Sequence, residues 1–277
     1  MGKVFVFDAA QCTGCRNCQL ACKDEHVDND WSPIALPQPD TGQFWLHLRE
    51  KVRGQVPKVK LAYVAHMCQH CDAAPCMQAA ADMGRKDAIY KRPDGLVIID
   101  PVASKGMEHI EDACPYGAIF YNEALAVPQK CTGCAHLVDE GLPPHCVDVC
   151  PHGALRFGDE EDFAAEIAAS EELIEGSGAK PRVHYLNLPK RFLAGVVVDL
   201  EADEVVIGAK VTAENLDTGE VLVEQTDAFG DFWFHQVAAA DWRVYVEADG
   251  FMTRAIEAST KEEDRNVGPI EVFAAMA

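Results

Sequence analysis

The stretch "CTGCRNCQLAC", residues 12 to 22, contains four cysteines separated by steps of three, three and four positions. Eight more cysteines follow, in "CQHCDAAPC" (residues 68 to 76), at Cys114, and in "CTGCAHLVDEGLPPHCVDVC" (residues 131 to 150). Disulfide bonds among so many cysteines would need an oxidising compartment, and nothing in the sequence indicates one. The pattern therefore favours metal coordination.

The spacing C-x2-C-x2-C-x3-C in residues 12 to 22 is typical of [4Fe–4S] clusters. A short loop can wrap three thiolates around one face of such a cluster, while the fourth cysteine lies on the following helix and ligates a neighbouring cluster. Zinc is the alternative, because paired C-x2-C groups often form structural zinc sites. A zinc site usually takes two ligands from each of two loops, so three successive cysteines favour iron–sulfur clusters over zinc.

Cys114 stands apart from the other cysteines, and an internal repeat explains why. The segment "FVFDAAQCTGC" aligns with "VIIDPVASKGM", which brings Ser104 to the position of Cys12. In this register Cys114 takes the position of Cys22, ten residues further on.

The same alignment identifies positions of the repeat that have lost a cysteine. They are Ser104, Met107, Ile110 and Ala80. If the first motif pairs with the fourth and the second with the third, these positions together are the ligand shell of one missing cluster. We expect the apolar members to fill the vacated volume.

The remaining cysteines then form three complete shells, with none left over. We name them the first group (Cys12, Cys15, Cys18 and Cys150), the second group (Cys22, Cys131, Cys134 and Cys146) and the third group (Cys68, Cys71, Cys76 and Cys114). Each group is expected to hold one [4Fe–4S] cluster, which gives three clusters in the protein.

Composition excludes several classes of partner. The 277 residues include 24 Lys and Arg against 45 Asp and Glu, a formal net charge of −21, which argues against nucleic acid and anionic membranes. No run approaches the roughly 18 apolar residues of a membrane span. The start "MGKVFVFDAAQC" does not read as a secretory signal, so we expect a cytoplasmic protein.

Two segments outside the motifs carry strong charge. The basic run "REKVRGQVPKVK" (residues 49 to 60) is interpreted as a solvated strand and turn, or alternatively as a docking site for an acidic partner surface. The acidic segment "GDEEDFAAEIAASEELIEGSG" (residues 158 to 178) is predicted to form one amphipathic helix. Phe163, Ile167 and Ile174 recur in it at roughly helical spacing.

From about residue 191, seven short β-rich runs alternate with turn signals such as "DTG" and "DAFG". In "WRVYVEA", Trp242, Val244 and Val246 alternate with more polar residues, which indicates one buried and one exposed face. The pattern "GAKV…N…TGE…TDAFGDFWF" resembles carboxypeptidase regulatory-like domains. Nothing here looks catalytic, and His235 is interpreted as a surface strand residue, so we expect a docking or stabilising module.

The four-motif layout, with "CPYGAIF" and "CPHGALRF" ending its two halves, resembles the electron-transfer small subunits of the dimethyl sulfoxide reductase family of molybdopterin enzymes. The missing shell and the C-terminal β-domain make it most similar to members that act on phenolic aromatics. This resemblance implies a heterodimer with a large catalytic subunit. That partner alone would carry molybdopterin guanine dinucleotide with Mo or W and would bind any small-molecule substrate.

The expected fold class is α+β. A two-lobed bacterial-ferredoxin-like cluster domain (residues 1–158, with an insertion at 23–65) is followed by an acidic helix and linker (159–190). An all-β, seven-stranded immunoglobulin/transthyretin-like domain (191–277) completes the protein. The alternatives are a subunit of a related anaerobic aromatic hydroxylase or catechol dehydroxylase, a free-standing ferredoxin-like carrier, and a structural zinc protein.

Several histidines lie near the cysteine motifs, namely His66, His70, His109, His136, His145 and His152. Because cysteine supplies all twelve expected ligands, these histidines are interpreted as packing or hydrogen-bonding residues. Some of them can tune a cluster's potential by donating to its sulfur atoms.

Overall fold

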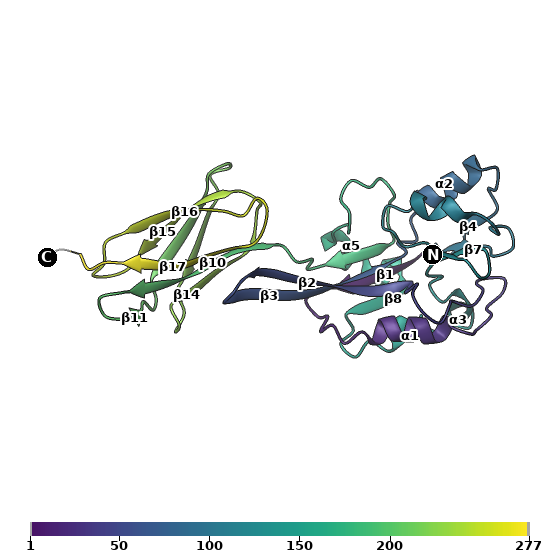
Figure 1. The fold of residues 1–277 in the computed structure, drawn as a ribbon, viewed down its shortest axis with the longest axis horizontal. Coiled ribbons are helices and arrows are strands. Elements are labelled where there is room, and N and C mark those ends of the chain that lie inside the picture. Colours follow the sequence, from purple (N-terminus) through teal and green to yellow (C-terminus); the bar gives the residue numbers. More distant parts are fainter. Residues whose placement is uncertain (1, 276–277) are drawn as a thin grey trace. The chain divides into compact units, whose positions relative to one another are not determined.

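The computed structural model describes residues 2–275, so the predicted domain limits at residues 1 and 277 lie outside the described part. The protein divides into two compact units (Figure 1). The first unit comprises Met1–Glu50 and Ala62–Leu188, and the second comprises Lys51–Leu61 and Pro189–Ala277. Residues 51–61, which the sequence analysis placed in an insertion of the first domain, thus belong with the C-terminal strands.

A three-stranded sheet in the order β8–β1–β9 supports the first unit. The central strand β1 (Lys3–Asp8) is antiparallel to β8 (Leu155–Asp159) and parallel to β9 (Val183–Leu186). Every β1 residue after Lys3 is buried, as expected for a strand paired on both edges. The first cysteine loop leaves directly from the end of β1, so this sheet fixes where the first motif begins.

Short helices and hairpins surround this sheet and carry the cysteine motifs (Figure 1). The helices are α1 (Asn17–His26), α2 (Pro75–Asp82), the 3-10 helix η1 (Glu108–Ala113), α3 (Ala135–Asp139) and α4 (His145–Asp148). The hairpins are β2 (Leu46–Gln55) with β3 (Lys58–Met67), β4 (Ile89–Lys91) with β5 (Val97–Ile99), and β6 (Phe120–Asn122) with β7 (Val127–Gln129). Helix α1 packs against α4, and α2 packs against η1, which follows the pairing of motifs expected from the repeat.

The acidic segment forms a shorter helix than the sequence predicted. The 3-10 helix η2 (Glu160–Phe163) leads into α5 (Ala164–Ala169), and the backbone becomes extended at Ser170. The Ser170 hydroxyl donates to the carbonyl oxygen of Ile167, and the next residue, Glu171, forms a β-bridge with Tyr185. Ile174 therefore lies outside the helix, because pairing with β9 competes successfully with continued helix formation.

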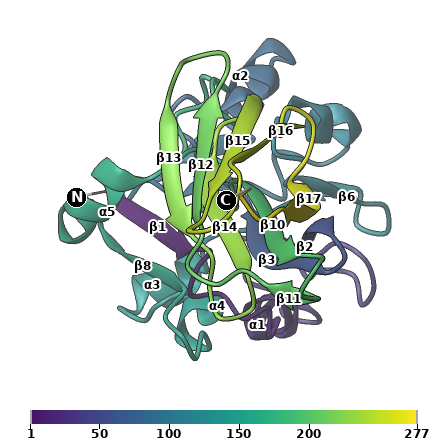
Figure 2. The same ribbon diagram turned by 90° about the vertical axis from the view of Figure 1, so that its left-hand side faces the viewer.

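The second unit contains two four-stranded sheets. Its strands are β10 (Arg191–Asp199), β11 (Glu204–Val205), β12 (Lys210–Asn215), β13 (Val221–Gln225), β14 (Asp231–Val237), β15 (Asp241–Glu247), β16 (Arg254–Ser259) and β17 (Arg265–Val272). One sheet has the order β11–β10–β14, with β17 also paired to β10, and the other has the order β13–β12–β15–β16 (Figure 2). Residues 189–275 thus contain eight strands rather than the predicted seven, since the two-residue β11 is too short to produce an alternation in the sequence.

The core of the second unit follows the predicted alternation. Trp242, Val244 and Val246 on β15 are buried, whereas Arg243 and Tyr245 are partly exposed. The indole nitrogen of Trp242 donates to Oγ1 of Thr260 at 2.9 Å, so the polar atom of this buried ring is satisfied.

The basic run has partners within the protein itself. Lys58 forms an ion pair with Asp231, and Nη1 of Arg53 lies 3.1 Å from Oδ1 of Asp264. The ammonium group of Lys60 lies 4.6 Å from the centre of the Trp233 ring, within the range of a cation–π contact. The run thus forms the predicted strand and turn, but acidic and aromatic residues of the second unit hold its tip, so Arg53, Lys58 and Lys60 are not simply solvated.

No helix within residues 2–275 has both the length and the apolar character needed to cross a membrane.

Candidate metal centres

The first group forms around the loop that joins β1 to α1. Cys12 and Cys15 lie on this loop, Cys18 lies in the first turn of α1, and Cys150 follows α4. Packing of α1 against α4 brings Cys150 to the loop, and the Cys18 thiol interacts electrostatically with the three other thiols. Burial, assisted by these neighbours, raises the pKa of Cys18 to about 12.

Gly14 allows the backbone to turn between the first two of these cysteines. Its φ of 73° lies in the left-handed region, and a Cβ there would lie 2.3 Å from the ring of Tyr63. Both the backbone conformation and the close approach of this ring require glycine.

The second group is completely enclosed. Cys22, Cys131, Cys134 and Cys146 have exposures of only 4 to 6%. The Cys22 thiol interacts with Cys131 and Cys134, and the Cys146 thiol interacts with all three other members. Burial raises the pKa of Cys131 and of Cys134 to about 12.

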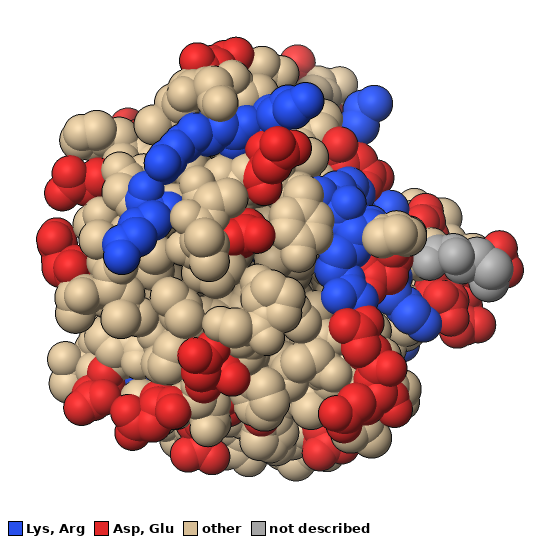
Figure 3. All heavy atoms as spheres, turned by 90° about the vertical axis from the view of Figure 1, so that its right-hand side faces the viewer, with Lys and Arg blue, Asp and Glu red and all other residues tan. Residues whose placement is uncertain are grey.

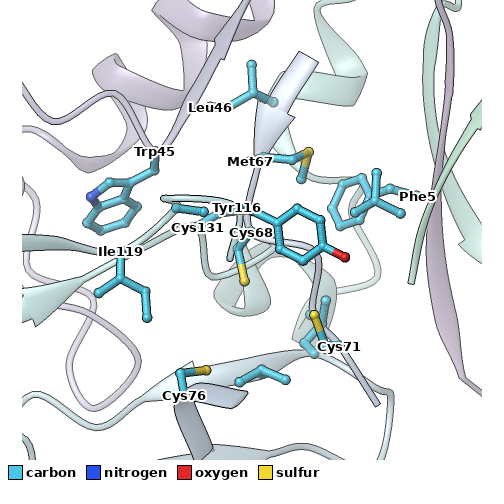
Figure 4. Close-up of a cluster of buried hydrophobic side chains, with 14 of the residues drawn as sticks. Phe5, Trp45, Leu46, Met67, Cys68, Cys71, Cys76, Tyr116, Ile119 and Cys131 are labelled. Carbon is cyan, nitrogen blue, oxygen red and sulfur yellow. The ribbon is translucent and has the colours of Figure 1, made fainter. Parts of the chain in front are cut away.

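The third group contains the isolated Cys114, which directly follows η1. Because η1 packs against α2, this cysteine reaches the motif that precedes and begins α2. All four members line one cavity, together with Ala74 and Ile119. The sulfur atoms of Cys68, Cys71 and Cys76 are turned toward a common space (Figure 4).

The three groups follow one another in order. Cys18 of the first group interacts electrostatically with Cys22 and Cys146 of the second. Cys131 of the second group interacts in the same way with Cys68 of the third. Exposure differs along this row, because Cys15 of the first group is exposed while the second group is buried.

The chemistry of these donors fits clusters of iron and sulfide. All twelve cysteines are free thiols, four to each group. Within residues 2–275, no three His, Cys, Asp or Glu side chains lie close enough together to bind a single metal ion. Four cysteines in each group are the donor set of a [4Fe–4S] cluster.

Backbone N–H groups point at several of the sulfurs. Gly133 N–H donates to Sγ of Cys131 at 3.3 Å, and Ala118 N–H donates to Sγ of Cys114 at 3.4 Å. Such hydrogen bonds favour the ionised thiolate, which is the form that binds metal.

The positions that lost their cysteines are buried. Ala80 and Ser104 have no exposed surface, and Met107 and Ile110 are 1% exposed. The three apolar residues belong to the hydrophobic core of the first unit, in agreement with the expected filling of the vacated shell. The hydroxyl of Ser104 has no hydrogen-bond partner.

His70 lies between the second and third groups. Its backbone N–H donates to Sγ of Cys68 at 3.4 Å, and its Nε2 lies 3.7 Å from Sγ of Cys131. Its Nδ1 accepts the N–H of Val97 at 3.0 Å, which leaves the proton of a neutral ring on Nε2, facing the sulfur. Burial lowers the pKa of His70 well below its usual value, so the ring is neutral.

A second set of histidines lies beside the second group. Nε2 of His26 lies 3.9 Å from Sγ of Cys134. The carboxylate of Glu25 lies 2.9 Å from both His136 and His145. These side chains surround the second group with polar atoms without replacing any of its cysteines.

The other histidines named from the sequence lie elsewhere. His66 stacks on His47, with ring centres 5.5 Å apart, and His109 and His152 are exposed. Two further residues beside the cysteines, His26 and Lys130, were not predicted from the sequence. His26 follows Cys22 by four positions on α1 and so shares its helix face, and Lys130 directly precedes Cys131.

Charge is unevenly distributed on the first unit. Figure 3 views this unit from the side of α2 and β4. Lys and Arg gather there in bands beside a broad area without charged side chains, although acidic residues outnumber basic ones in the protein.

Comparison with known proteins gives matches in both units. The family model of a 4Fe-4S dicluster domain matches residues 59–160, and that of a carboxypeptidase regulatory-like domain matches residues 193–269. The chain is 35% identical over 257 residues to the pyrogallol hydroxytransferase small subunit of Pelobacter acidigallici, covering 88% of this chain and 90% of that protein.

Two further relatives match a smaller part of the sequence. It is 32% identical over 196 residues to an anaerobic dimethyl sulfoxide reductase protein of Escherichia coli (strain K12), covering 65% of the present sequence and 85% of that protein. It is 30% identical over 196 residues to a tetrathionate reductase protein of Salmonella typhimurium (strain LT2), covering 68% and 73% respectively.

Proposed function

The chain belongs to the iron–sulfur electron-transfer subunits of the dimethyl sulfoxide reductase family, and from this premise we propose that it serves a large molybdopterin subunit acting on phenolic aromatics. The single observation that carries this proposal is the assembly of twelve cysteines into three groups of four, arranged in a row. A [4Fe–4S] cluster in each group supplies one-electron exchange.

The ligands proposed for each cluster are the members of the first, second and third groups. Electrostatic contacts among the thiols within each group support this assignment, as does the common cavity of the third group. The protein's own contribution is to bury these thiols, to direct backbone N–H groups at their sulfurs and to keep water from the second group.

We infer that the partner docks where the first group approaches the surface. Cys15 is exposed, and Cys12 and Cys150 are half-buried, so electrons can enter or leave the row there over a short distance. The second group is enclosed and lies between the other two. The partner would carry the molybdopterin with Mo or W, in a heterodimer with this protein.

The choice of phenolic substrates rests on the extent of one alignment. The match to the hydroxytransferase small subunit covers 88% of this chain and so includes much of the second unit, whereas the match to the dimethyl sulfoxide reductase protein covers 65%. Twelve free thiols also suit a reducing compartment such as the cytoplasm. A subunit of a related anaerobic aromatic hydroxylase or catechol dehydroxylase is the second candidate.

Native purification without a tag, under anaerobic conditions, tests the proposal. We expect a large subunit to co-elute at constant ratio, with Mo or W and about twelve iron atoms per copy of this protein, four for each of three clusters. Elution of this protein alone would instead support a free-standing carrier. Stoichiometric zinc in place of iron would refute the cluster assignment.

Assays of the complex separate the two enzymatic candidates. Hydroxyl transfer between two phenolic rings needs no external electrons, whereas removing a hydroxyl from one ring consumes two electrons and two protons and releases water. With pyrogallol as substrate, we expect turnover without added reductant. Turnover that depends strictly on a reductant such as reduced methyl viologen would favour the dehydroxylase.

A further inference from the structure

Lys130 is a buried cation without a carboxylate partner. It is buried, with an exposure of only 3%. Its ammonium group donates to the carbonyl oxygen of Val97 and, at 3.0 Å, to that of Cys131. Among residues 2–275 no Asp or Glu forms an ion pair with it.

The Lys130 ammonium interacts with thiols of two different groups. Lys130 interacts electrostatically with Cys76 and Cys114 of the third group, and with Cys131 of the second. It also lines the cavity that the four cysteines of the third group enclose. Lys130 thus lies at the junction between the second and third groups.

Burying an ammonium group without a counter-charge is unfavourable, even after the surroundings relax. Carbonyl oxygens supply only partial negative charge. Four thiolates outweigh the positive charge of a [4Fe–4S] core, so each ligated group is a net anion. Two such anions would supply the counter-charge that the protein's own side chains do not provide for Lys130.

The remaining polar groups at this junction carry no net positive charge. His70 spans the two groups but is a neutral hydrogen-bond donor. Lys91 donates to the carbonyl oxygens of His70 and Cys71, but Oδ1 of Asp72 lies 2.9 Å from its ammonium group and compensates the charge. Among residues 2–275, Lys130 is therefore the cation at this junction that has no carboxylate partner.

We propose that Lys130 sets the reduction potentials of the second and third clusters, holding both higher than they would otherwise be. The inference rests on the proposed function. A reduced cluster carries one more negative charge than an oxidised one, so a nearby fixed cation stabilises the reduced state. Since the same charge acts on both sides of the junction, it raises the two potentials together.

The test is a redox titration of the purified complex, followed by electron paramagnetic resonance. K130M removes the charge but keeps the length of the side chain. We expect the reduced-to-oxidised ratio of the second and third clusters, measured at the potential where each wild-type cluster is half reduced, to fall about tenfold. For a one-electron couple this corresponds to a reduction potential lower by about 59 mV. The first cluster is an internal reference and should not shift.

Two further variants separate charge from structure. K130R keeps the charge and should restore both potentials toward the wild-type values. The double variant K91M/D72N removes a neighbouring lysine together with the carboxylate that compensates it, so the local net charge is unchanged and the ratio should shift less than about twofold. If K130M assembles incompletely, K130Q is used, because its neutral amide can still donate to a carbonyl oxygen.

The role of Lys130 would be refuted if a neutral variant kept its full iron content and the reduction potentials of its second and third clusters did not change. Equal shifts in K130R and K130M would also refute it, since the effect would then be one of packing. Wild-type complex without three iron–sulfur signals would instead refute the proposed function, so the two failures can be distinguished.

Discussion

Cys18 and Cys22 lie one helical turn apart on α1, yet their thiols contact different groups. Cys18 interacts most strongly with Cys12 and Cys150, and Cys22 interacts most strongly with Cys131 and Cys134. Because residues four apart project from the same side of a helix at successive levels, one helix can contribute to two neighbouring centres. Helix α1 is thus the covalent link between the first and second groups.

This arrangement predicts which substitutions share a spectroscopic effect. C22S and C146S should both alter or abolish the signal of one cluster, while C18S and C150S should both alter that of another. The measurement is electron paramagnetic resonance of the reduced complex, together with iron analysis. If C18S and C22S affected the same signal, the division of α1 between two centres would be wrong.

The vacated shell supports a prediction about stability. Met107 is 1% exposed in the core of the first unit, so M107A should create a cavity and reduce the free energy of unfolding by about 2 to 5 kcal/mol. Met83, at 50% exposure, is the matched control, and M83A should cost less than about 0.5 kcal/mol. Denaturant unfolding of the two variants measures the difference. Equal effects would show that Met107 does not fill the vacated volume.

Asp264 joins the hairpin tip to the strands of the second unit. Its Oδ1 accepts the backbone N–H of Phe192 at 2.8 Å and Nη1 of Arg53 at 3.1 Å. D264A removes the acceptor of the Phe192 N–H and the counter-charge of Arg53, whose Nη1 keeps the carbonyl oxygen of Lys190, and we expect it to cost about 2 to 4 kcal/mol. Hydrogen exchange of the β10 and β17 amides should become faster.

The control for this variant is E263A, which removes the exposed neighbouring carboxylate. It should leave amide exchange in β10 and β17 unchanged, since exposed charges contribute little to stability. Faster exchange in both variants would mean that the effect is one of general charge rather than of the Asp264 hydrogen bonds.

The thiol pKa values predict how iron retention depends on pH. Burial raises the pKa of Cys71 and of Cys131 to about 12, and that of Cys76 to about 11. An unligated thiol in these sites is therefore protonated throughout the neutral range, and protons compete with iron for the sulfur. Lowering the pH favours the proton.

We therefore expect iron to pass to a chelator faster at about pH 6 than at about pH 8. The release can be followed by the absorbance of the iron–chelator complex under anaerobic conditions. A release rate that rose with pH would contradict the assignment of protonated thiols to the metal-free sites.

Several parts of the fold and site were predictable from local pattern. The alternation of Trp242, Val244 and Val246 identified a strand with one buried face, because side chains on a strand alternate strictly. The repeat placed Cys114 in a motif otherwise without cysteines, and the structure brings it to Cys68, Cys71 and Cys76. This pairing of distant cysteines could be predicted only because the two halves of the domain share the same spacing between motif positions.

Other features depended on contacts between segments that are far apart in the sequence, and a local sequence pattern does not reveal such contacts. The acidic helix ends at Ala169 because Glu171 pairs with Tyr185, a residue that is close in space but fourteen positions away in sequence. Residues of the basic run form ion pairs with Asp231 and Asp264, which lie more than 170 positions further along the sequence.

The sequence by itself determined the number and type of the sulfur donors and their spacing within each motif, because that spacing is a property of the covalent chain, and it predicted how the motifs pair. Only the tertiary structure decided the order of the three groups and what lies between them. Burial, electrostatic neighbours and the compensation of a charge such as that of Lys130 arise when distant segments pack together. These quantities depend on three-dimensional surroundings, so the positions of residues along the sequence cannot specify them.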